Sequence, residues 1–167
     1  MKNDFSFKAA TQEDVPILLR FILERIRWMD EQGIRQWNVS NYGAAYSKIY
    51  YERIADEGML YALYDEKGAP LCFGALFEKD DRWVDGAPAL YLHHFVSAMG
   101  ARGAGKIFLY HAEILAEEKG KSFLRLDAAQ DNMILASYYE RLGFAAVGTC
   151  SEGLYQGTLR QKEIKKF

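Results

Sequence analysis

The chain has 167 residues, of which 50% are hydrophobic and 26% are charged, and its formal net charge is −2. This length and composition predict one globular domain, residues 1–167, that is large enough to bury a sizeable core. The slightly acidic balance argues against the basic groove of a nucleic-acid-binding protein.

The chain opens without the basic and apolar segment of a secretory signal, and no apolar run approaches the ~18 residues of a membrane span. The two cysteines, Cys72 and Cys150, lack the spacing and the histidine neighbours of a metal site. We therefore expect a cytoplasmic protein with buried free thiols, no metal and no membrane partner.

The first half of the chain contains one strand pattern and two helical patterns. Residues 5–9 alternate as in a strand. Apolar residues at helical spacing follow Thr11, run to about Gln32 and stop at Gly33. A second helical pattern begins at Tyr42 and ends near residues 57–58.

Strands dominate the rest of the chain. Residues 59–64 and 71–77 form a predicted hairpin, and residues 89–96 a further strand. Helices at 104–119 and 132–142 then alternate with a strand at 123–126 and a final hairpin of 145–150 and 154–159. The order βααβββαβαββ predicts an α+β fold with a mixed, mostly antiparallel central sheet, flanked by helices on both faces.

A glycine-rich loop separates the strand at 89–96 from the next helix. Its sequence is Gly100-Ala-Arg-Gly-Ala-Gly-Lys106. A strand, a glycine loop and a helix build a phosphate site, because bare backbone N–H groups meet at the positive end of the helix. We therefore expect a phosphorylated ligand at this loop.

One interpretation of the loop is a nucleotide-binding P-loop, because residues 100–106 fit the pattern G-x-x-x-x-G-K. That motif continues with a Ser or Thr that holds Mg²⁺, and here Ile107 follows. A P-loop also needs several later β-α units, and only one clear unit follows Lys106. We therefore reject this interpretation.

A second interpretation rests on two motifs. Arg102 and Gly103-Ala-Gly105 fit the loop Q/R-x-x-G-x-G/A, although Gly100 stands where a Gln or Arg is expected. Downstream, an Asn opens a helix that ends in Tyr-Glu-x-x-Gly-Phe, over residues 132–144. In this order and spacing the chain resembles the GNAT superfamily of acyl-CoA N-acyltransferases. Residues 27–37 also resemble the substrate-side region of a bacterial branch of that superfamily.

The resemblance implies which residues hold acetyl-CoA, the expected co-substrate. The glycine loop would bind its pyrophosphate, Asn132 would reach its pantetheine arm, and the backbone of the strand would polarise the acetyl carbonyl. Tyr139 would contact the thiol and protonate the departing thiolate, although Tyr138 is an alternative. The implied cofactor-binding residues are Phe95, Val96, Ser97, Arg102, Gly103, Ala104, Gly105, Lys106, Asn132 and Tyr139.

A base for the acceptor amine is less directly indicated. Many relatives use a Glu on the strand at 89–96, and this strand contains no acid. It does contain His93 and His94, and a histidine suits proton acceptance at neutral pH. Strand alternation predicts one of them on each face of the sheet, with His94 on the face of Leu92 and Val96. We favour His94 as the catalytic base and place His93 with the substrate residues, while either can be structural.

The acceptor pocket is expected between the first two helices. Trp28, Trp37 and Tyr42 fall in this region, together with Tyr46. Aromatic rings there would suit an apolar or cationic amine. The alternative is that the rings only pack the helices on the sheet.

These features predict an N-acetyltransferase that transfers acetyl from acetyl-CoA to a primary amine by direct attack in a ternary complex. The acceptor would be a small-molecule amine or an amino group of a peptide or protein, and a homodimer would be common for this fold. One alternative is a transferase of a longer acyl group. The other is a non-catalytic acyl-CoA-binding module that regulates a partner.

Overall fold

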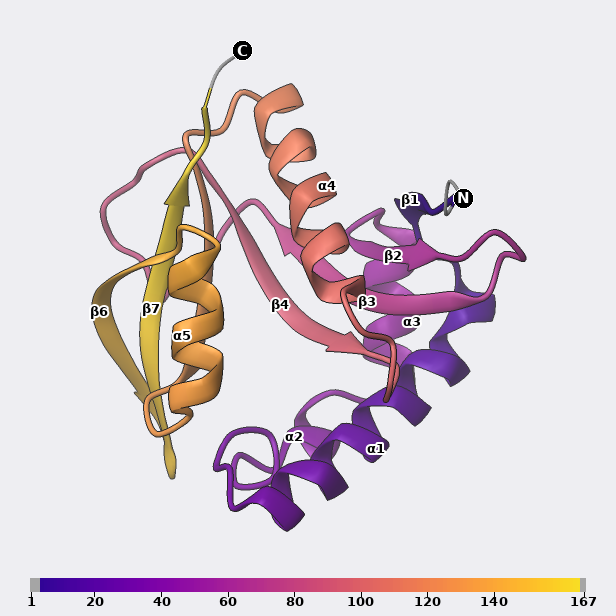
Figure 1. The fold of residues 1–167 in the computed structure, drawn as a ribbon, viewed down its shortest axis with the longest axis horizontal. Helices are drawn as coiled ribbons and strands as arrows, with labels where there is room; N and C mark the ends of the chain where they lie inside the picture. Colours follow the sequence, from indigo (N-terminus) through magenta and orange to yellow (C-terminus); the bar gives the residue numbers. More distant parts are fainter. Residues whose placement is uncertain (1–3, 166–167) are drawn as a thin grey trace.

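The computed structural model describes residues 4–165. Seven strands form one sheet with the order β1-β2-β3-β4-β5-β7-β6 (Figure 1). All neighbouring strands are antiparallel except β4 and β5, which are parallel. The strands are β1 (Ser6–Ala9), β2 (Leu60–Tyr64), β3 (Pro70–Phe77), β4 (Ala89–Ser97), β5 (Phe123–Ala129), β6 (Ala145–Glu152) and β7 (Tyr155–Glu163).

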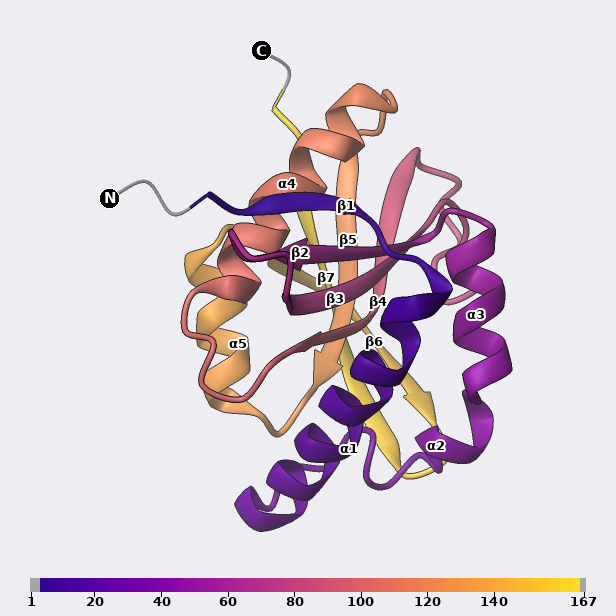
Figure 2. The same ribbon diagram turned by 90° about the vertical axis from the view of Figure 1, so that its right-hand side faces the viewer.

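Helices cover both faces of the sheet, which confirms the predicted fold class (Figure 2). One core cluster packs α4 and α5 against the sheet, around Phe108 and Phe144. The other packs α1 and α3 on the opposite face, around Leu18 and Ile54. The helices are the short 3₁₀ helix η1 (Gln12–Asp14), α1 (Val15–Gln32), α2 (Tyr42–Ala45), α3 (Lys48–Asp56), α4 (Ala104–Glu118) and α5 (Met133–Arg141).

Most helix ends lie where their sequence signals predict. The backbone N–H of Thr11 donates to the carboxylate of Asp14 over 3.0 Å, and α1 ends before Gly33, whose φ of 71° is left-handed. The single helix predicted from Tyr42 to residue 57 is wrong, because α2 and α3 are separate. Tyr46 is extended after α2, and the side chain of Ser47 then caps α3 by accepting from the N–H of Tyr50.

The two parallel strands pair over a short distance only. Residues 89–91 of β4 lie opposite residues 123–125 of β5, and beyond these three pairs the strands diverge. On its other side, β4 carries a bulge where it pairs with β3. His94 has φ 55° there, and Gly74 faces it across the strand pair. A Cβ on Gly74 would come within 2.7 Å of Leu92 and Phe108, so only glycine fits.

None of the helices within residues 4–165 has both the length and the apolar character needed to cross a membrane. The same residues contain no group of three His, Cys, Asp or Glu arranged to hold a metal ion. Both cysteines are free; Cys72 is buried and Cys150 is partly exposed.

Candidate active site

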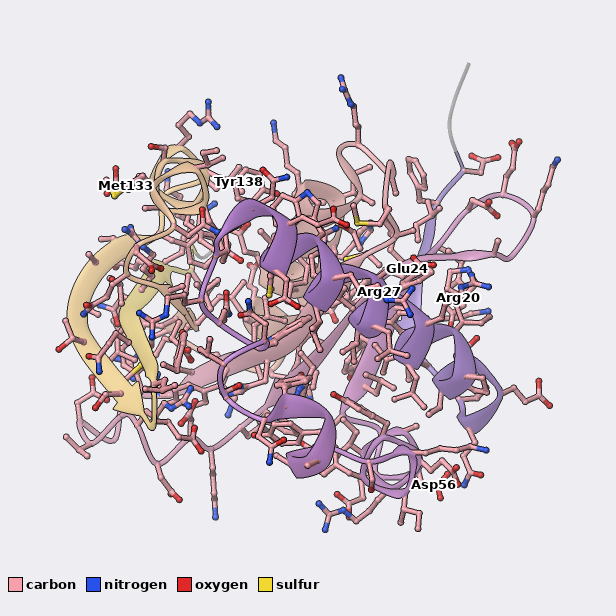
Figure 3. All side chains as sticks on the ribbon, turned by 90° about the horizontal axis from the view of Figure 1, so that it is seen from below. Arg20, Glu24, Arg27, Asp56, Met133 and Tyr138 are labelled. Carbon is pink, nitrogen blue, oxygen red and sulfur yellow. The ribbon has the colours of Figure 1, made fainter. Side chains whose placement is uncertain are left out.

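A cleft of about 780 Å³ opens where β4 and β5 diverge. Its walls come from α1, the segment between α1 and α2, the end of β4, the start of α4, and α5. Viewed from below, α1 with Arg27 and α5 with Tyr138 stand apart at its two sides (Figure 3). The predicted site residues in its lining are Trp28, Trp37, Tyr42, His93, His94, Phe95, Val96, Ser97, Gly103, Gly105, Asn132 and Tyr139.

The glycine loop leads directly into α4. Gly103 is the N-cap of α4 with φ 81°, a conformation that glycine adopts without strain. A Cβ on Gly105 would lie 3.3 Å from the Phe95 ring and 3.4 Å from the Tyr138 hydroxyl, so the lack of a side chain keeps this part of the cleft open. Ala104 is buried, whereas Arg102 and Lys106 are exposed beside the loop and do not line the cleft.

This loop fits a pyrophosphate. The first N–H groups of α4 have no acceptor within the helix, and the positive end of the helix dipole lies at the same place. Arg102 and Lys106 add positive charge next to these groups. N–H groups without an acceptor inside the helix, a helix N-terminus and two cations together match what a pyrophosphate requires.

Helix α5 contributes Asn132 and Tyr139. Asn132 caps the helix, because its Oδ1 accepts from the N–H of Leu135 over 3.0 Å. Tyr139 is buried, and its burial raises the pKa of the phenol well above its ordinary value. Within residues 4–165 no side chain or backbone group forms a hydrogen bond with its hydroxyl, so this donor is free on the wall of the cleft.

The bulge in β4 overturns the predicted orientation of the two histidines. Because His94 is left-handed, alternation breaks, and both imidazoles contact the Phe77 ring at centroid distances of 5.5 and 6.3 Å. Phe95 turns to the other face, where it packs against Phe108. His93 and His94 therefore lie on the same face, with their ring centroids 6.1 Å apart.

His94 is enclosed by tyrosines. The Tyr50 hydroxyl lies 2.9 Å from its Nε2, and the hydroxyls of Tyr42 and Tyr51 contact its Nδ1. Burial, assisted by His93, lowers the pKa of His94 to about 3. His94 is therefore neutral at physiological pH, and both of its ring nitrogens are already engaged.

His93 has a carboxylate partner that sequence reasoning missed. Its Nε2 lies 2.6 Å from Oδ2 of Asp80, while Oδ1 of Asp80 accepts from the N–H of Arg82 over 2.9 Å. Burial would raise the pKa of Asp80, but these hydrogen bonds outweigh it and hold the pKa below its ordinary value. Asp80 lies in the loop between β3 and β4, and no sequence pattern pairs it with His93.

The same loop places a second polar group at the cleft. The guanidinium of Arg82 lies 2.9 Å from Asp127 on β5 and 2.7 Å from Glu152 on β6. The Tyr155 hydroxyl donates to the other oxygen of Asp127 over 2.6 Å. All four side chains line the cleft, and the sequence analysis identified none of them.

The predicted aromatic residues do gather on the acceptor side. Trp37 stacks on Tyr42 with ring centroids 4.7 Å apart, and Tyr42 contacts Tyr46 at 4.8 Å. Trp28 lies separately, with the Arg25 guanidinium 5.0 Å from its ring. Trp37, Tyr42 and Tyr46 also pack on the hydrophobic core, so these rings both line the cleft and hold the helices on the sheet.

The chain is similar in sequence and in structure to known acetyltransferases. The family model described as "Acetyltransferase (GNAT) family" matches residues 23–144. A comparison with curated protein sequences finds no match. A GNAT-family acetyltransferase structure from Listeria monocytogenes is 27% identical with a TM-score of 0.77, and the match covers 95% of this chain and 94% of that chain.

Two more distant structures share the fold. A GNAT-family acetyltransferase from Streptococcus agalactiae is 18% identical with a TM-score of 0.79, covering 97% of this chain and 96% of that one. The PaiA N-acetyltransferase from Thermoplasma acidophilum, in complex with coenzyme A, is 17% identical with a TM-score of 0.70, covering 96% and 99%. Because the family model spans well over half of the sequence, this chain belongs to the GNAT acetyltransferase family of acyl-CoA-dependent acyltransferases.

Proposed function

We propose that this protein transfers an acetyl group from acetyl-CoA to a primary amine, by direct attack of the amine in a ternary complex. The observation that carries the proposal is the cleft between β4 and β5. Its lining includes the glycine loop before α4, the free phenol of Tyr139 and a set of aromatic rings. A phosphate anchor, a proton donor and an acceptor pocket are thereby combined in one cavity.

The cofactor half of the proposal assigns the pyrophosphate to the loop. The N–H groups of Gly103, Ala104 and Gly105 would hold it, although that of Ala104 also donates to the Ala101 carbonyl over 3.3 Å. Arg102 and Lys106 would add charge. The backbone of Phe95, Val96 and Ser97 would run beside the pantetheine arm and polarise the carbonyl, with Asn132 on the opposite wall. The PaiA structure, which contains coenzyme A, supports this choice of co-substrate.

Tyr139 is proposed as the general acid. The departing thiolate needs a proton, and a phenol whose pKa is raised by burial remains a donor at neutral pH. No other group in residues 4–165 holds its hydroxyl. The neighbouring Tyr138 lies near Gly105, on the cofactor side.

The acceptor is proposed to be an apolar or cationic amine, either a small molecule or an amino group of a peptide. Trp37 and Tyr42 would contact its body, with Trp28 and His93 at the edge of the pocket. A longer acyl group and a non-catalytic binding module remain the alternatives. The free Tyr139 hydroxyl favours a catalytic protein over a non-catalytic binding module.

The test is thiol release from acetyl-CoA in the presence of primary amines: an arylalkylamine, a linear diamine and a short peptide. We expect Tyr139→Phe to lower kcat at least about tenfold, because a positioned acid contributes ~10²–10⁴. The affinity for CoA, measured by calorimetry, should not change. Tyr138→Phe is the matched control and should retain kcat.

The alternatives give different results. Binding of CoA without turnover on any amine would support the regulatory module. A higher kcat/KM with butyryl-CoA or hexanoyl-CoA than with acetyl-CoA would support the longer acyl group. Equal kcat for Tyr139→Phe and the native protein would remove Tyr139 as the acid.

A further inference from the structure

We infer that Asp80 and His93 form a dyad that takes the proton of the acceptor amine, with His93 as the catalytic base and Asp80 as its positioning residue. The inference rests on the proposed function, because it assigns one step of that reaction. It begins from the 2.6 Å contact between Nε2 of His93 and Oδ2 of Asp80. Neither the glycine loop nor the aromatic pocket requires this contact.

The dyad fixes the imidazole in one orientation. A carboxylate only accepts hydrogen bonds, so Nε2 carries the proton that it shares with Asp80. Nδ1 is then the unprotonated nitrogen of the neutral ring. Within residues 4–165 Nδ1 has no hydrogen-bond partner, and 24% of the His93 side chain is exposed while the residue lines the cleft. The arrangement leaves a free basic nitrogen at the cleft wall.

His94 lacks such a nitrogen. Tyr42 and Tyr51 engage its Nδ1, and Tyr50 engages its Nε2. The bulge at His94 places both imidazoles on one face, so that His93 stands between this tyrosine cluster and Asp80. The geometry therefore points to His93 rather than His94 as the base, while His94 supports the wall behind it.

The loop that carries Asp80 is itself anchored. Asp80 accepts from the N–H of Arg82, and the Arg82 side chain is paired with Asp127 on β5. Farther along the loop, Asp85 pairs with Arg125 at 2.6 Å, and that guanidinium lies over the Trp83 ring at 4.3 Å. These contacts hold Asp80 in place without any help from His93, as a positioning residue requires.

The dyad supplies the first proton transfer of the reaction. The acceptor ammonium loses one proton to Nδ1 of His93, and its nitrogen forms a bond to the carbonyl carbon. The C–S bond breaks with its electron pair on sulfur, which takes a proton from Tyr139. The surplus proton on the new amide nitrogen returns to the Tyr139 phenolate through solvent. The products are an N-substituted acetamide, the free thiol and one proton, which His93 releases to solvent.

Several charged or titratable groups face His93. Asp80 and the neutral His94 lie closest, and Arg82, Asp127, Glu152 and Tyr46 lie across this part of the cleft. Of these, Asp80 alone is hydrogen-bonded to the His93 ring. Removing its charge should disfavour the protonated imidazole, because an adjacent carboxylate stabilises that form.

The kinetic test compares Asp80→Asn with Asp81→Asn. The second variant removes the same charge from an exposed neighbour that forms no hydrogen bond or ion pair within residues 4–165. We expect Asp80→Asn to lower kcat at least about tenfold and to shift the acid limb of the pH–rate profile to lower pH, with KM for acetyl-CoA unchanged. Asp80→Glu should restore part of kcat, and His93→Gln should abolish the limb. An Asp80→Asn enzyme that matches Asp81→Asn would overturn the inference.

A second measurement needs no turnover. In the cofactor-free protein, NMR titration of the imidazole carbon-bound protons should show the His93 midpoint at lower pH in Asp80→Asn than in Asp81→Asn. Absence of that shift excludes the pairing even if activity is lost. If the native protein acetylates none of the amines, the proposed function and the catalytic role both fall; turnover that survives His93→Gln removes only the dyad.

Discussion

Two adjacent histidines on β4 have different surroundings although a single peptide bond separates them. His94 is 7% exposed and is bound only to tyrosine hydroxyls, whereas His93 is bound to a carboxylate. Burial among tyrosine hydroxyls favours an imidazole that stays neutral, whereas a neighbouring carboxylate favours an imidazole that can accept a proton. The left-handed φ of His94 produces this difference, because it turns both rings to the same side of the sheet.

The buried His94 should make folding stability depend on pH. Its pKa is about 3 in the folded protein, so between pH 6.5 and 3 the unfolded chain binds a proton that the native state does not. The stabilisation is present above pH 6.5 and is lost as pH falls, up to about 5 kcal/mol for an isolated group. Asparagine tolerates a φ of 55°. We therefore expect the free energy of unfolding in urea to fall less from pH 7 to pH 4 in His94→Asn than in the native protein.

His111→Asn is the control for that measurement. Burial also lowers the pKa of His111, but this residue stacks on Phe7 and is only partly buried. Its replacement should change the pH dependence much less. If the native protein and His94→Asn lose stability in parallel between pH 7 and pH 4, the buried imidazole is not the cause.

Sequence reasoning identified residues that belong to local motifs and missed those defined by distant contacts. Gly103, Asn132 and Tyr139 could be placed on the cleft because each has a fixed place in a helix: the first two are the N-caps of α4 and α5, and Tyr139 lies within α5. Asp80 lies 13 residues before its partner His93, and a bulge decides which side that partner faces. Bulges follow from packing across strands, here around Gly74, so alternation in one strand could not reveal this one.

Among the elements, α4 begins and ends at left-handed glycines. Gly103 precedes its first residue with φ 81°, and Gly120 follows its end with φ 70°. At both positions a Cβ would meet open space, so substitution introduces backbone strain without a steric clash. Of these two glycines, Gly103 lines the cleft and Gly120 does not.

This pair separates ligand binding from helix stability. We expect Gly103→Ala and Gly120→Ala to lose similar stability, about 1 kcal/mol each, because alanine is strained in the left-handed region. Gly103→Ala alone should weaken CoA binding about tenfold or more, since it changes the direction of the N–H groups at the start of α4. Thermal unfolding and calorimetric titration with CoA measure the two effects. Equal CoA affinity in both variants would place the pyrophosphate elsewhere.

The break between α2 and α3 shows why helix boundaries were harder to predict than helix existence. Tyr42, Ala45, Tyr46 and Ile49 continue one helical period, but Ile49 is 77% exposed and so does not belong to a buried helix face. The Ser47 cap restarts the helix after an extended Tyr46. The new helix start turns Tyr50 and Tyr51 towards His94. These tertiary contacts cannot be read from the spacing of apolar residues in the sequence.

At the scale of the molecule, the sheet consists of two halves that meet at three residue pairs of β4 and β5. Strands β1 to β4 form one half and strands β5 to β7 the other. At the closed end of the cleft, Arg125 on β5 is almost fully buried, contacts the Tyr91 hydroxyl on β4 and binds Gln161 on β7. The sequence patterns predicted the order of helices and strands along the chain, whereas this junction depends on contacts between distant residues.

A ligand in the cleft should join the two halves where the strands do not. Beyond Tyr91 and Arg125, the facing edges of β4 and β5 do not pair with each other, so the two strands are held there by their ladders to β3 and β7 and not by hydrogen bonds between them. CoA at about a hundred times its Kd should slow openings that release it about a hundredfold. We expect slower amide hydrogen exchange in residues 92–97 and also in residues 126–129. The turn at residues 65–68 lies outside the cleft lining and serves as the internal control. Protection of one strand without the other would mean that the ligand rests on one half of the sheet and does not bridge them.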